Sequence, residues 1–565
     1  MSPVKKLWFT KYCIFFSFLA TSCAHQNELT NYAEKHAMVV SAHPIASKVG
    51  LEIMKNGGNA ADAVVAVQMA LAVVYPSAGN IGGGGFLVYR SKDGSAISLD
   101  FREKASGSAS STMYLDENSN VVENLSLIGH KSVGVPGTVD GMVKFHQRFG
   151  SLPWESLIQP AIDIAIKGFN LTKMEAEKLN YFNANKCISL NEDNPYFSEL
   201  FKEGDTLRLL ELAETLKIIK NNKRSGFYEG IIASKIIEEI KNNGGIISHL
   251  DLAAYESVWR KPIISSYKNY KIIGMGPPSS GGILLSQMLK MLEHFNLDTV
   301  DFHSDTYIHL IAEIERRSFA DRSEHLGDPD FHEVPLNRLL DSTYLLERLK
   351  TIKMTKATKS DTIKPGNFYN NESEETTHFS IVDNLGNSVA VTTTLNSSFG
   401  SGVIVKDAGF ILNNEMDDFS IKPGYPNLYG LIGGIVNSIE PGKRMLSSMT
   451  PTILEKDNEL FMVVGSPGGS TIITAVLQTI LNVIEYEMTI DSAVRSPRFH
   501  HQWLPDQIKM EDIFVSDTLL TRKLKELGHN LKFVSSMNRV DAILVRNGLL
   551  YGGADPRGDD YSASF

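Results

Sequence analysis

Thr376 lies where a threonine could act as a nucleophile. A polar stretch from about Lys353 to Glu375 ends there, and the alternating pattern over 377–382 predicts a β-strand. A cut before Thr376 would leave an N-terminus with a hydroxyl and an α-amine of pKa about 7.7–8.0. One residue would then supply both nucleophile and base. Read locally, however, Thr-Thr before an apolar run is also ordinary strand sequence.

Six further segments are rich in glycines, hydroxyl-bearing residues and charged residues. They are 79–86 (GNIGGGGF), 100–103 (DFRE), 392–396 (TTTLN), 412–419 (LNNEMDDF), 444–451 (RMLSSMTP) and 465–470 (GSPGGS). In this order and spacing the chain resembles the γ-glutamyltranspeptidase family from about Met38 to Phe565. Members of that family are made as one chain and cleave themselves into a large and a small subunit.

The resemblance implies how Thr376 works. Its hydroxyl would first attack the carbonyl of Glu375 and, after this self-cleavage, the γ-amide carbon of a glutamyl substrate. The freed α-amine would take the hydroxyl proton and return it to the leaving amine. Thr394 matches the supporting threonine that hydrogen-bonds the nucleophile; the alternative is a simple strand residue.

Gly468 and Gly469 lie between a predicted strand and a predicted helix. Backbone N–H groups at such a helix start are unpaired, and the helix dipole is positive there. This geometry suits an oxyanion hole. A phosphate cradle is the alternative, but no Lys-Ser/Thr follows the glycines.

The resemblance also implies how the α-amino-acid end of a substrate is bound. Arg102 can hold a carboxylate through two parallel N–H bonds, which a lysine cannot do. The matching positions are Ser447 and Ser448 for the carboxylate, and Asn396, Glu415 and Asp418 for the ammonium. A solvated acidic loop is the alternative for the run at 415–418.

A lid is expected over 423–434 (PGYPNLYGLIGG), where Tyr429 matches the family's tyrosine that covers the bound glutamyl group. Glycine and proline at its ends suit a mobile flap. Some family members lack this lid and take larger substrates. Its presence favours small γ-glutamyl compounds such as glutathione.

Composition narrows the function classes. The 565 residues are 42% hydrophobic and 21% charged with a net charge of −10, which is typical of a globular protein and lacks the basic patch expected for nucleic-acid binding. No CxxC or HExxH motif occurs, so neither a metal nor a cofactor is expected. Cys187 is the only thiol beyond the leader, so no internal disulfide is expected.

The N-terminus predicts export from a bacterial cytoplasm. Residues 1–23 have a basic start, a short apolar core and the lipobox-like sequence LATSC at 19–23, which would make Cys23 the lipidated first residue. Cleavage by ordinary signal peptidase is the alternative. Residues 24–37 are polar and suit a tether. The expected location is the periplasm or cell envelope, with the lipid as the only membrane anchor.

The hydrophobic pattern indicates an α/β protein. Helices are predicted over 46–55, 60–74 and about 470–486, and mostly amphipathic helix over 157–349. Hairpins are predicted for 86–90 with 96–101, 377–383 with 388–395, and 451–454 with 460–466. The resemblance then implies the N-terminal-nucleophile hydrolase fold, a four-layer αββα sandwich built from a large subunit (38–375) and a small subunit (376–565).

The expected activity is that of a γ-glutamyltransferase and glutathione hydrolase, with water, an amino acid or a peptide accepting the γ-glutamyl group. One alternative is a cephalosporin-type acylase of the same fold, although Arg102 and Asp418 argue against it. The other is an uncleaved envelope binding or scaffold lipoprotein. A denaturing gel separates the enzyme, which runs as two bands, from the scaffold.

Overall fold

Local sequence sets the start of α2 (Ala60–Val74), a fully buried helix. Asn59 caps α2 by accepting the N–H groups of Ala61 and Asp62, and Asp62 bonds back to the N–H of Asn59. Every residue of α2 is buried. This computed structural model describes residues 33–34, 36–187, 190–191, 200–364, 376–422, 425 and 434–565, which belong to one unit, Tyr32–Phe565.

Seven described strands form an antiparallel sheet that contains the hairpin following Thr376. In spatial order they are β19 (Tyr561–Ser564), β2 (Met38–Ser41), β10 (Thr377–Val382), β11 (Ser388–Thr394), β3 (Gly84–Arg90), β4 (Ala96–Asp100) and β7 (Val258–Arg260). Strands from both sides of residue 376 are therefore neighbours within one sheet.

A second antiparallel sheet has the same mixed origin. Its described strands are, in spatial order, β1 (Ala33–Glu34), β18 (Leu549–Gly553), β17 (Asp541–Arg546), β13 (Glu459–Gly465), β12 (Thr452–Lys456), β9 (Tyr270–Gly274) and β8 (Ile263–Tyr267). In one smaller sheet β15 (Ile508–Glu511) pairs with β14 (Phe499–His500) and with β16 (Leu531–Val534). In another, β5 (Phe169–Asn170) pairs with β6 (Thr206–Leu207).

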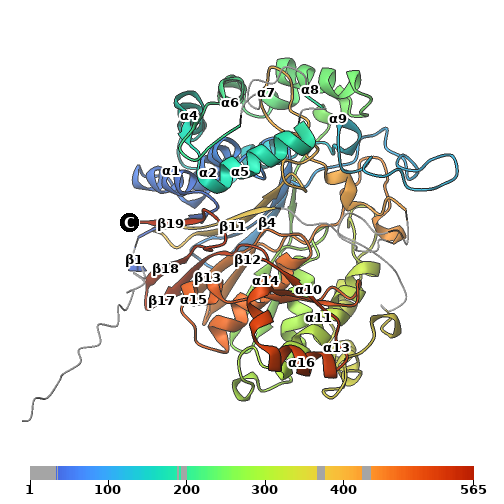
Figure 1. The fold of residues 1–565 in the computed structure, drawn as a ribbon. Helices are drawn as coiled ribbons and strands as arrows, with labels where there is room; N and C mark the ends of the chain where they lie inside the picture. Colours follow the sequence, from blue (N-terminus) through green and yellow to red (C-terminus); the bar gives the residue numbers. More distant parts are fainter. Residues whose placement is uncertain are drawn as a thin grey trace, which may run out of the picture. The chain divides into compact units, whose positions relative to one another are not determined.

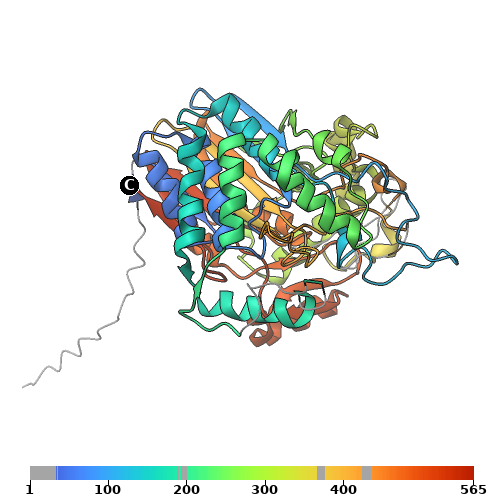
Figure 2. The same ribbon diagram turned by 90° about the horizontal axis from the view of Figure 1, so that it is seen from above.

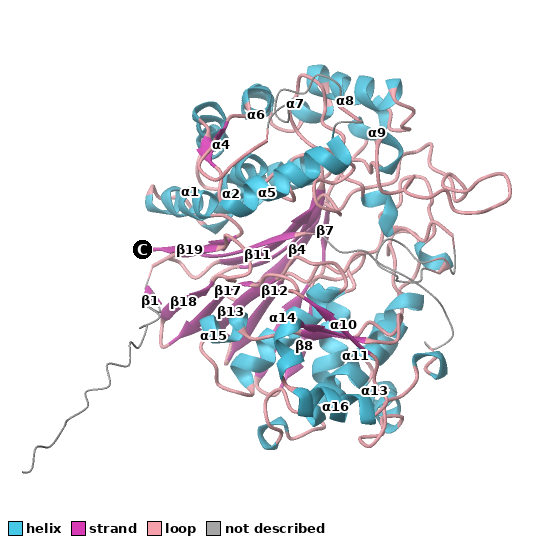
Figure 3. Ribbon diagram, in the orientation of Figure 1, coloured by secondary structure: helices cyan, strands magenta, loops and turns pink. Residues whose placement is uncertain are grey.

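Helices cover the outer face of each large sheet (Figures 1 and 3). On the side of β11 lie α1 (Pro44–Lys55), α2, α3 (Thr138–Phe149), α4 (Trp154–Lys167), α5 (Lys173–Phe182), α6 (Leu210–Asn222), α7 (Ser225–Tyr228), α8 (Gly230–Asn242) and α9 (His249–Ala253). Figure 2 looks down on this helical layer. On the side of β12 lie α10 (Gly281–Leu292), α11 (Asp305–His325), α12 (Leu336–Leu339), α13 (Ser342–Lys350), α14 (Thr471–Ile484), α15 (Ile490–Arg495) and α16 (Thr518–Glu526).

Alternating side chains of the strands divide the interior into two apolar cores. Along β2, Val39 packs into the core shared with α1 and α2, whereas Met38 and Val40 pack into the core shared with the second sheet and α14. This is the period-two pattern of a sheet that is buried on both faces. The expected four-layer αββα sandwich is confirmed.

The predicted helices and hairpins around the nucleophile are confirmed, but the expectation of mostly helix over 157–349 is incomplete. The strands β7, β8 and β9 lie within that stretch and complete the edges of both sheets. In β8, at the edge of its sheet, Ile264 is exposed beside buried Ile263, which blurs the strand pattern. Among the described residues, no helix combines the length and apolar character that crossing a membrane requires.

Candidate active site

Thr376 is held by the strand that follows it. The next residue begins β10, which pairs with β2 on one side and β11 on the other. Thr377 lies opposite Thr393, so extending this register by one residue places Thr376 opposite Thr394. Thr376 is only 6% exposed. A central strand therefore positions the predicted nucleophile and its predicted support.

A small pocket joins most of the predicted site residues, and we call it the inner pocket. It is lined by Arg102, Thr376, Thr394, Asn396, Glu415, Asp418, Ser447, Ser448, Met449, Gly469 and Ile472. Its free volume is about 10 Å³. These residues come from segments that are distant in sequence, and the fold brings them together. The sequence had assigned them to one site only through the family resemblance.

Arg102 occupies the centre of the charge cluster in this pocket. Its guanidinium donates hydrogen bonds to the carboxylates of Glu415 and Asp418 and to the backbone oxygen of Leu446. It also lies 3.7 Å from Glu103. Burial alone would lower the pKa of Arg102, but attraction to these carboxylates outweighs it and raises the pKa. Arg102 is therefore a permanent, fully buried cation.

Burial raises the pKa of two carboxyl groups near Arg102. Burial raises the pKa of Glu103 to about 8, although the nearby charge of Arg102 opposes this. Burial likewise raises the pKa of Glu415 well above its usual range. The inner pocket thus carries less negative charge near neutral pH than three free carboxylates would give it.

A loop from the first half of the chain braces the two predicted carboxylate-binding serines. The N–H and hydroxyl of Ser280 both donate to the backbone oxygen of Ser447, each at 2.7 Å. Ser279 donates to the backbone oxygen of Met449 at 2.6 Å. Arg322 of α11 donates to the Ser280 hydroxyl at 2.9 Å. The position of Ser447 and Ser448 therefore depends on residues before the predicted cleavage point.

The predicted oxyanion glycines lie at the start of α14. Strand β13 ends at Gly465 and α14 begins at Thr471. Gly468 and Gly469 have φ of 122° and 60°, a region that favours glycine. Within the described residues, neither of their N–H groups has an acceptor. Gly469 lines the inner pocket and Gly468 lies just outside it, so two donors are available beside Thr376.

Two asparagines that sequence reasoning did not assign support this site. Asn538 donates to the backbone oxygen of Pro467 at 2.6 Å, and a Cβ on Gly468 would lie 2.4 Å from its Nδ2. No motif pointed to it. Asn80 lies within the segment 79–86 and donates at 2.9 Å to the backbone oxygen of Thr394. Both residues hold backbone near Thr376 in place.

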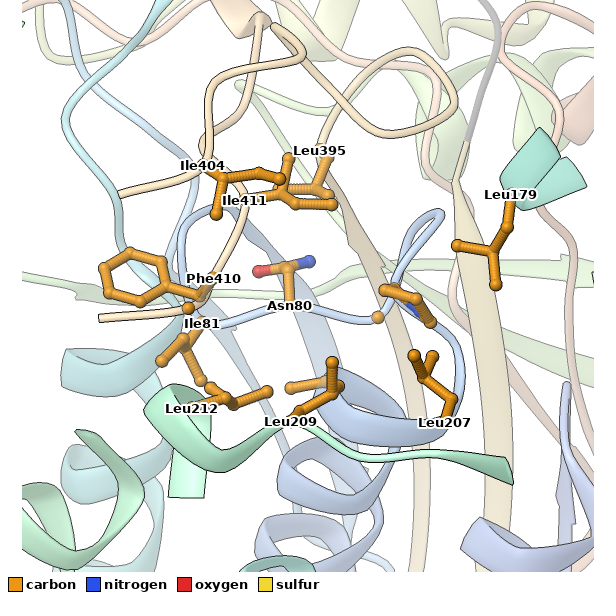
Figure 4. A pocket seen from close by; sticks show the side chains of 14 residues that line it. Asn80, Ile81, Leu179, Leu207, Leu209, Leu212, Leu395, Ile404, Phe410 and Ile411 are labelled. Atoms are coloured by element: carbon orange, nitrogen blue, oxygen red, sulfur yellow. The ribbon is translucent and has the colours of Figure 1, made fainter. Parts of the chain in front are cut away.

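A separate apolar pocket surrounds Asn80 (Figure 4). Its free volume is about 30 Å³, comparable to the space of one water molecule. Its lining is mostly leucine and isoleucine, including Leu209, Leu212 and Ile411. Its apolar lining offers no charged partner for the carboxylate or ammonium of an amino-acid substrate, so we place the site at Thr376 instead.

A second, much larger space of about 710 Å³ also borders Thr376, and we call it the outer cavity. It is lined by Tyr75, Met174, Lys178, Tyr181, Phe182, Thr376, Ser397, Ser398, Phe399, Pro467, Gly468, Thr471, Lys509, Val534, Ser536, Met537, Asn538, Arg539 and Arg557. Thr376 is the residue common to both linings. The predicted nucleophile therefore stands between two spaces of very different size.

Three of the predicted functional positions, Glu375, Tyr429 and Cys23, lie outside the described residues. Their assignments as cleavage partner, lid residue and lipidation site stay predictions. The geometry brings the residues of the inner pocket together but does not test their individual roles, which also stay predictions.

The layered sheets and the threonine at the head of a central strand define an N-terminal-nucleophile hydrolase. The fold agrees with the crystal structure of a cephalosporin acylase from Bacillus halodurans, with a TM-score of 0.83, 24% identity, and coverage of 97% of this chain and 99% of that one. At this identity, the likeness concerns the fold alone.

Sequence comparison narrows the class further. Residues 46–565 match the Gamma-glutamyltranspeptidase family. The chain is 44% identical to the glutathione hydrolase proenzyme of Escherichia coli K12, covering 94% of this chain and 92% of that one. A Helicobacter pylori gamma-glutamyltranspeptidase structure is 43% identical with a TM-score of 0.57, covering 58% of this chain and 94% of that one. The chain belongs to the gamma-glutamyltranspeptidase family.

Proposed function

We propose that this protein is a γ-glutamyltransferase and glutathione hydrolase. The supporting observation is the meeting of Thr376, Arg102 and Asp418 in one pocket that is otherwise lined mainly by polar side chains. An α-amino acid carries a carboxylate and an ammonium on one carbon, and the pocket offers a buried cation beside buried carboxyl groups. Arg102 and Asp418 form an ion pair with each other. On binding, the substrate's carboxylate can take the place of Asp418 beside Arg102, and its ammonium can take the place of Arg102 beside Asp418.

The chemistry follows from the position of Thr376. Its Oγ forms a bond to the γ-carbonyl carbon, and negative charge develops on the carbonyl oxygen, where the N–H groups of Gly468 and Gly469 stabilise it. The C–N bond then breaks, and the α-amine of Thr376, which has taken the proton of the Thr376 hydroxyl, delivers it to the leaving amine. Water or an acceptor amine attacks the resulting ester and regenerates Thr376.

Maturation uses the same oxygen. We infer that Thr376 Oγ attacks the carbonyl carbon of Glu375 in the precursor and that the peptide C–N bond breaks, which leaves an ester. Water then hydrolyses this ester and separates the large subunit, 38–375, from the small subunit, 376–565. The name proenzyme of the Escherichia coli relative and the shorter Helicobacter pylori chain fit a precursor that is cut in two. N-terminal sequencing of the smaller fragment tests this and should read Thr-Thr-His.

Product analysis tests the activity itself. Incubation with glutathione should release glutamate, and an added dipeptide should divert the γ-glutamyl group into a new peptide. A protein that turns over neither glutathione nor other γ-glutamyl amides would contradict the proposal. The acylase alternative predicts equal turnover of substrates that lack the α-amino group, for which Arg102 and Asp418 have no use.

The proposed location is the periplasm or cell envelope of a bacterium. The support is the leader at 1–23, in which Cys23 follows a lipobox-like sequence, and the polar tether at 24–37. A lipid on Cys23 would hold the protein at a membrane. Fractionation of wild-type and Cys23→Ser protein tests this: the variant should leave the membrane fraction, and wild-type protein found wholly in a soluble extract would refute the anchor.

A further inference from the structure

The outer cavity lies where the amine half of a γ-glutamyl amide must go. When the glutamyl group fills the inner pocket and its carbonyl carbon meets Thr376, the remainder of the substrate extends from the far side of that atom. Thr376 and Gly468 both line the outer cavity. Its volume of about 710 Å³ lies in the range of small-molecule sites and exceeds the needs of a water molecule.

The lining of the outer cavity is basic. Its charged members are Lys178, Lys509, Arg539 and Arg557, and no aspartate or glutamate appears among the described residues that line it. Two of these cations have carboxylate partners behind the wall: Arg557 pairs with Glu511 at 2.7 Å, and Arg539 with Asp560 at 2.9 Å. The surface presented to the cavity is nevertheless one of cations.

Two of the cations converge on one neutral oxygen. Lys178 and Arg539 donate to the hydroxyl of Tyr75 at 3.2 and 2.6 Å, and they lie over its ring at 5.3 and 5.0 Å from the centroid. Within the described residues, Lys178 forms no ion pair with a carboxylate. The two positive charges beside one hydroxyl repel each other. An anion placed beside them would be attracted by both and could accept a hydrogen bond from each.

Each half of the cleaved precursor supplies one of these cations. Lys178 belongs to α5, before residue 376, and Arg539 precedes β17, after it. Tyr75 itself follows the last turn of α2. The convergence therefore depends on the assembled pair of subunits rather than on either one.

We propose that the outer cavity binds the leaving amine and the acceptor, that it selects peptides with a free C-terminal carboxylate, and that Lys178 and Arg539 at Tyr75 bind that carboxylate. The proposal rests on the proposed function and names its acceptor class: anionic peptides rather than neutral amines or amides. The generous volume also admits peptides longer than two residues.

The test compares two acceptors that differ only in charge. With a γ-glutamyl anilide as donor, whose leaving group is neutral, we measure the KM for glycylglycine and for glycylglycinamide. The wild type should favour glycylglycine, and this preference should shrink as salt is raised. In Lys178→Gln the KM for glycylglycine should rise about tenfold, the effect of losing one charge-assisted bond, while that for glycylglycinamide changes little.

Matched variants separate binding from folding. Lys173→Gln removes a lysine from the same helix, where it is exposed near Glu177 and outside the cavity, and it should behave as wild type. Lys178→Arg keeps the charge and should restore the preference. Equal KM values for the two acceptors in the wild type, or equal shifts in Lys178→Gln, would overturn the inference. Failure of the wild type to release the anilide would instead refute the proposed function.

Discussion

The two spaces that meet at Thr376 differ in almost every physical respect. The inner pocket has about 10 Å³ of free volume, and its charges are buried and paired with one another. The outer cavity has about 710 Å³, and all the charged side chains among the described residues that line it are basic. A tightly packed, charge-matched pocket rejects altered ligands because any unpaired buried group is costly. A wide cavity constrains its ligand mainly through charge, so the acyl half should be recognised strictly and the amine half broadly.

The largest effect is expected where the two spaces meet. Thr376→Ala should stay a single chain and show no detectable turnover, because both the cleavage and the acyl transfer need its hydroxyl. A denaturing gel and an assay with glutathione measure this. Thr377→Ser is the matched control, since Thr377 is the next residue along the chain and the first of β10, and this variant should still be cut. Cleavage of Thr376→Ala at the same bond would show that another protease performs it.

Strict recognition in the inner pocket can be broken by removing one charge. Asp418→Asn leaves Arg102 with less compensation and removes the partner for the substrate's ammonium, so kcat/KM for γ-glutamyl amides should fall about 100-fold, the effect of breaking a buried charged contact. The matching glutaryl amide, which lacks the amino group, should lose far less. Equal losses for both substrates would assign Asp418 a purely structural role.

A milder change tests the geometry of the same pocket. Arg102→Lys keeps the charge but cannot form two parallel bonds to a carboxylate, so KM for γ-glutamyl amides should rise about 20-fold with less effect on maturation. The acceptor preference set by the outer cavity should not change. Steady-state kinetics with varied donor and varied acceptor separate the two. Unchanged donor KM would remove Arg102 from the substrate contacts.

The smallest effect concerns Glu103, the buried neighbour of Arg102. Its pKa is raised to about 8 in the folded chain from an ordinary 4.5, so between these values the folded state keeps a proton that the unfolded state has lost. The stability due to this proton is present at low pH and falls by about 1 kcal/mol per pH unit as pH rises toward 8. Glu103→Gln mimics the protonated form, so it should remove the part of the loss of stability with rising pH that is due to Glu103.

Denaturant unfolding at pH 6 and pH 7 measures this, with the uncut Thr376→Ala chain as the parent so that one polypeptide unfolds. The gain of the double variant over the parent should increase by about 1 kcal/mol from pH 6 to pH 7. An equal difference at both values would mean that Glu103 is ionised in the folded state.

Sequence patterns predicted the elements that are strongly periodic or bounded by clear turns. Helix α2 and the hairpin of β10 and β11 are examples. The edge strand β8 escaped because Ile264 is exposed on its outer face. The residues of the inner pocket were predicted through family motifs, but their mutual ion pairs were not, since Arg102 and Asp418 meet only through the tertiary fold. Asn538 escaped for the same reason, as it acts on Pro467 across more than seventy residues.

The mixed sheets have a consequence for the life of the mature protein. Strands β2 and β10 are neighbours in one sheet, and β9 and β12 are neighbours in the other, although the members of each pair fall on opposite sides of the cut. Separating the two halves would break whole rows of backbone hydrogen bonds at once. Subunits should therefore not exchange between molecules, and each large subunit should stay bound to the small subunit of the same precursor until both are degraded.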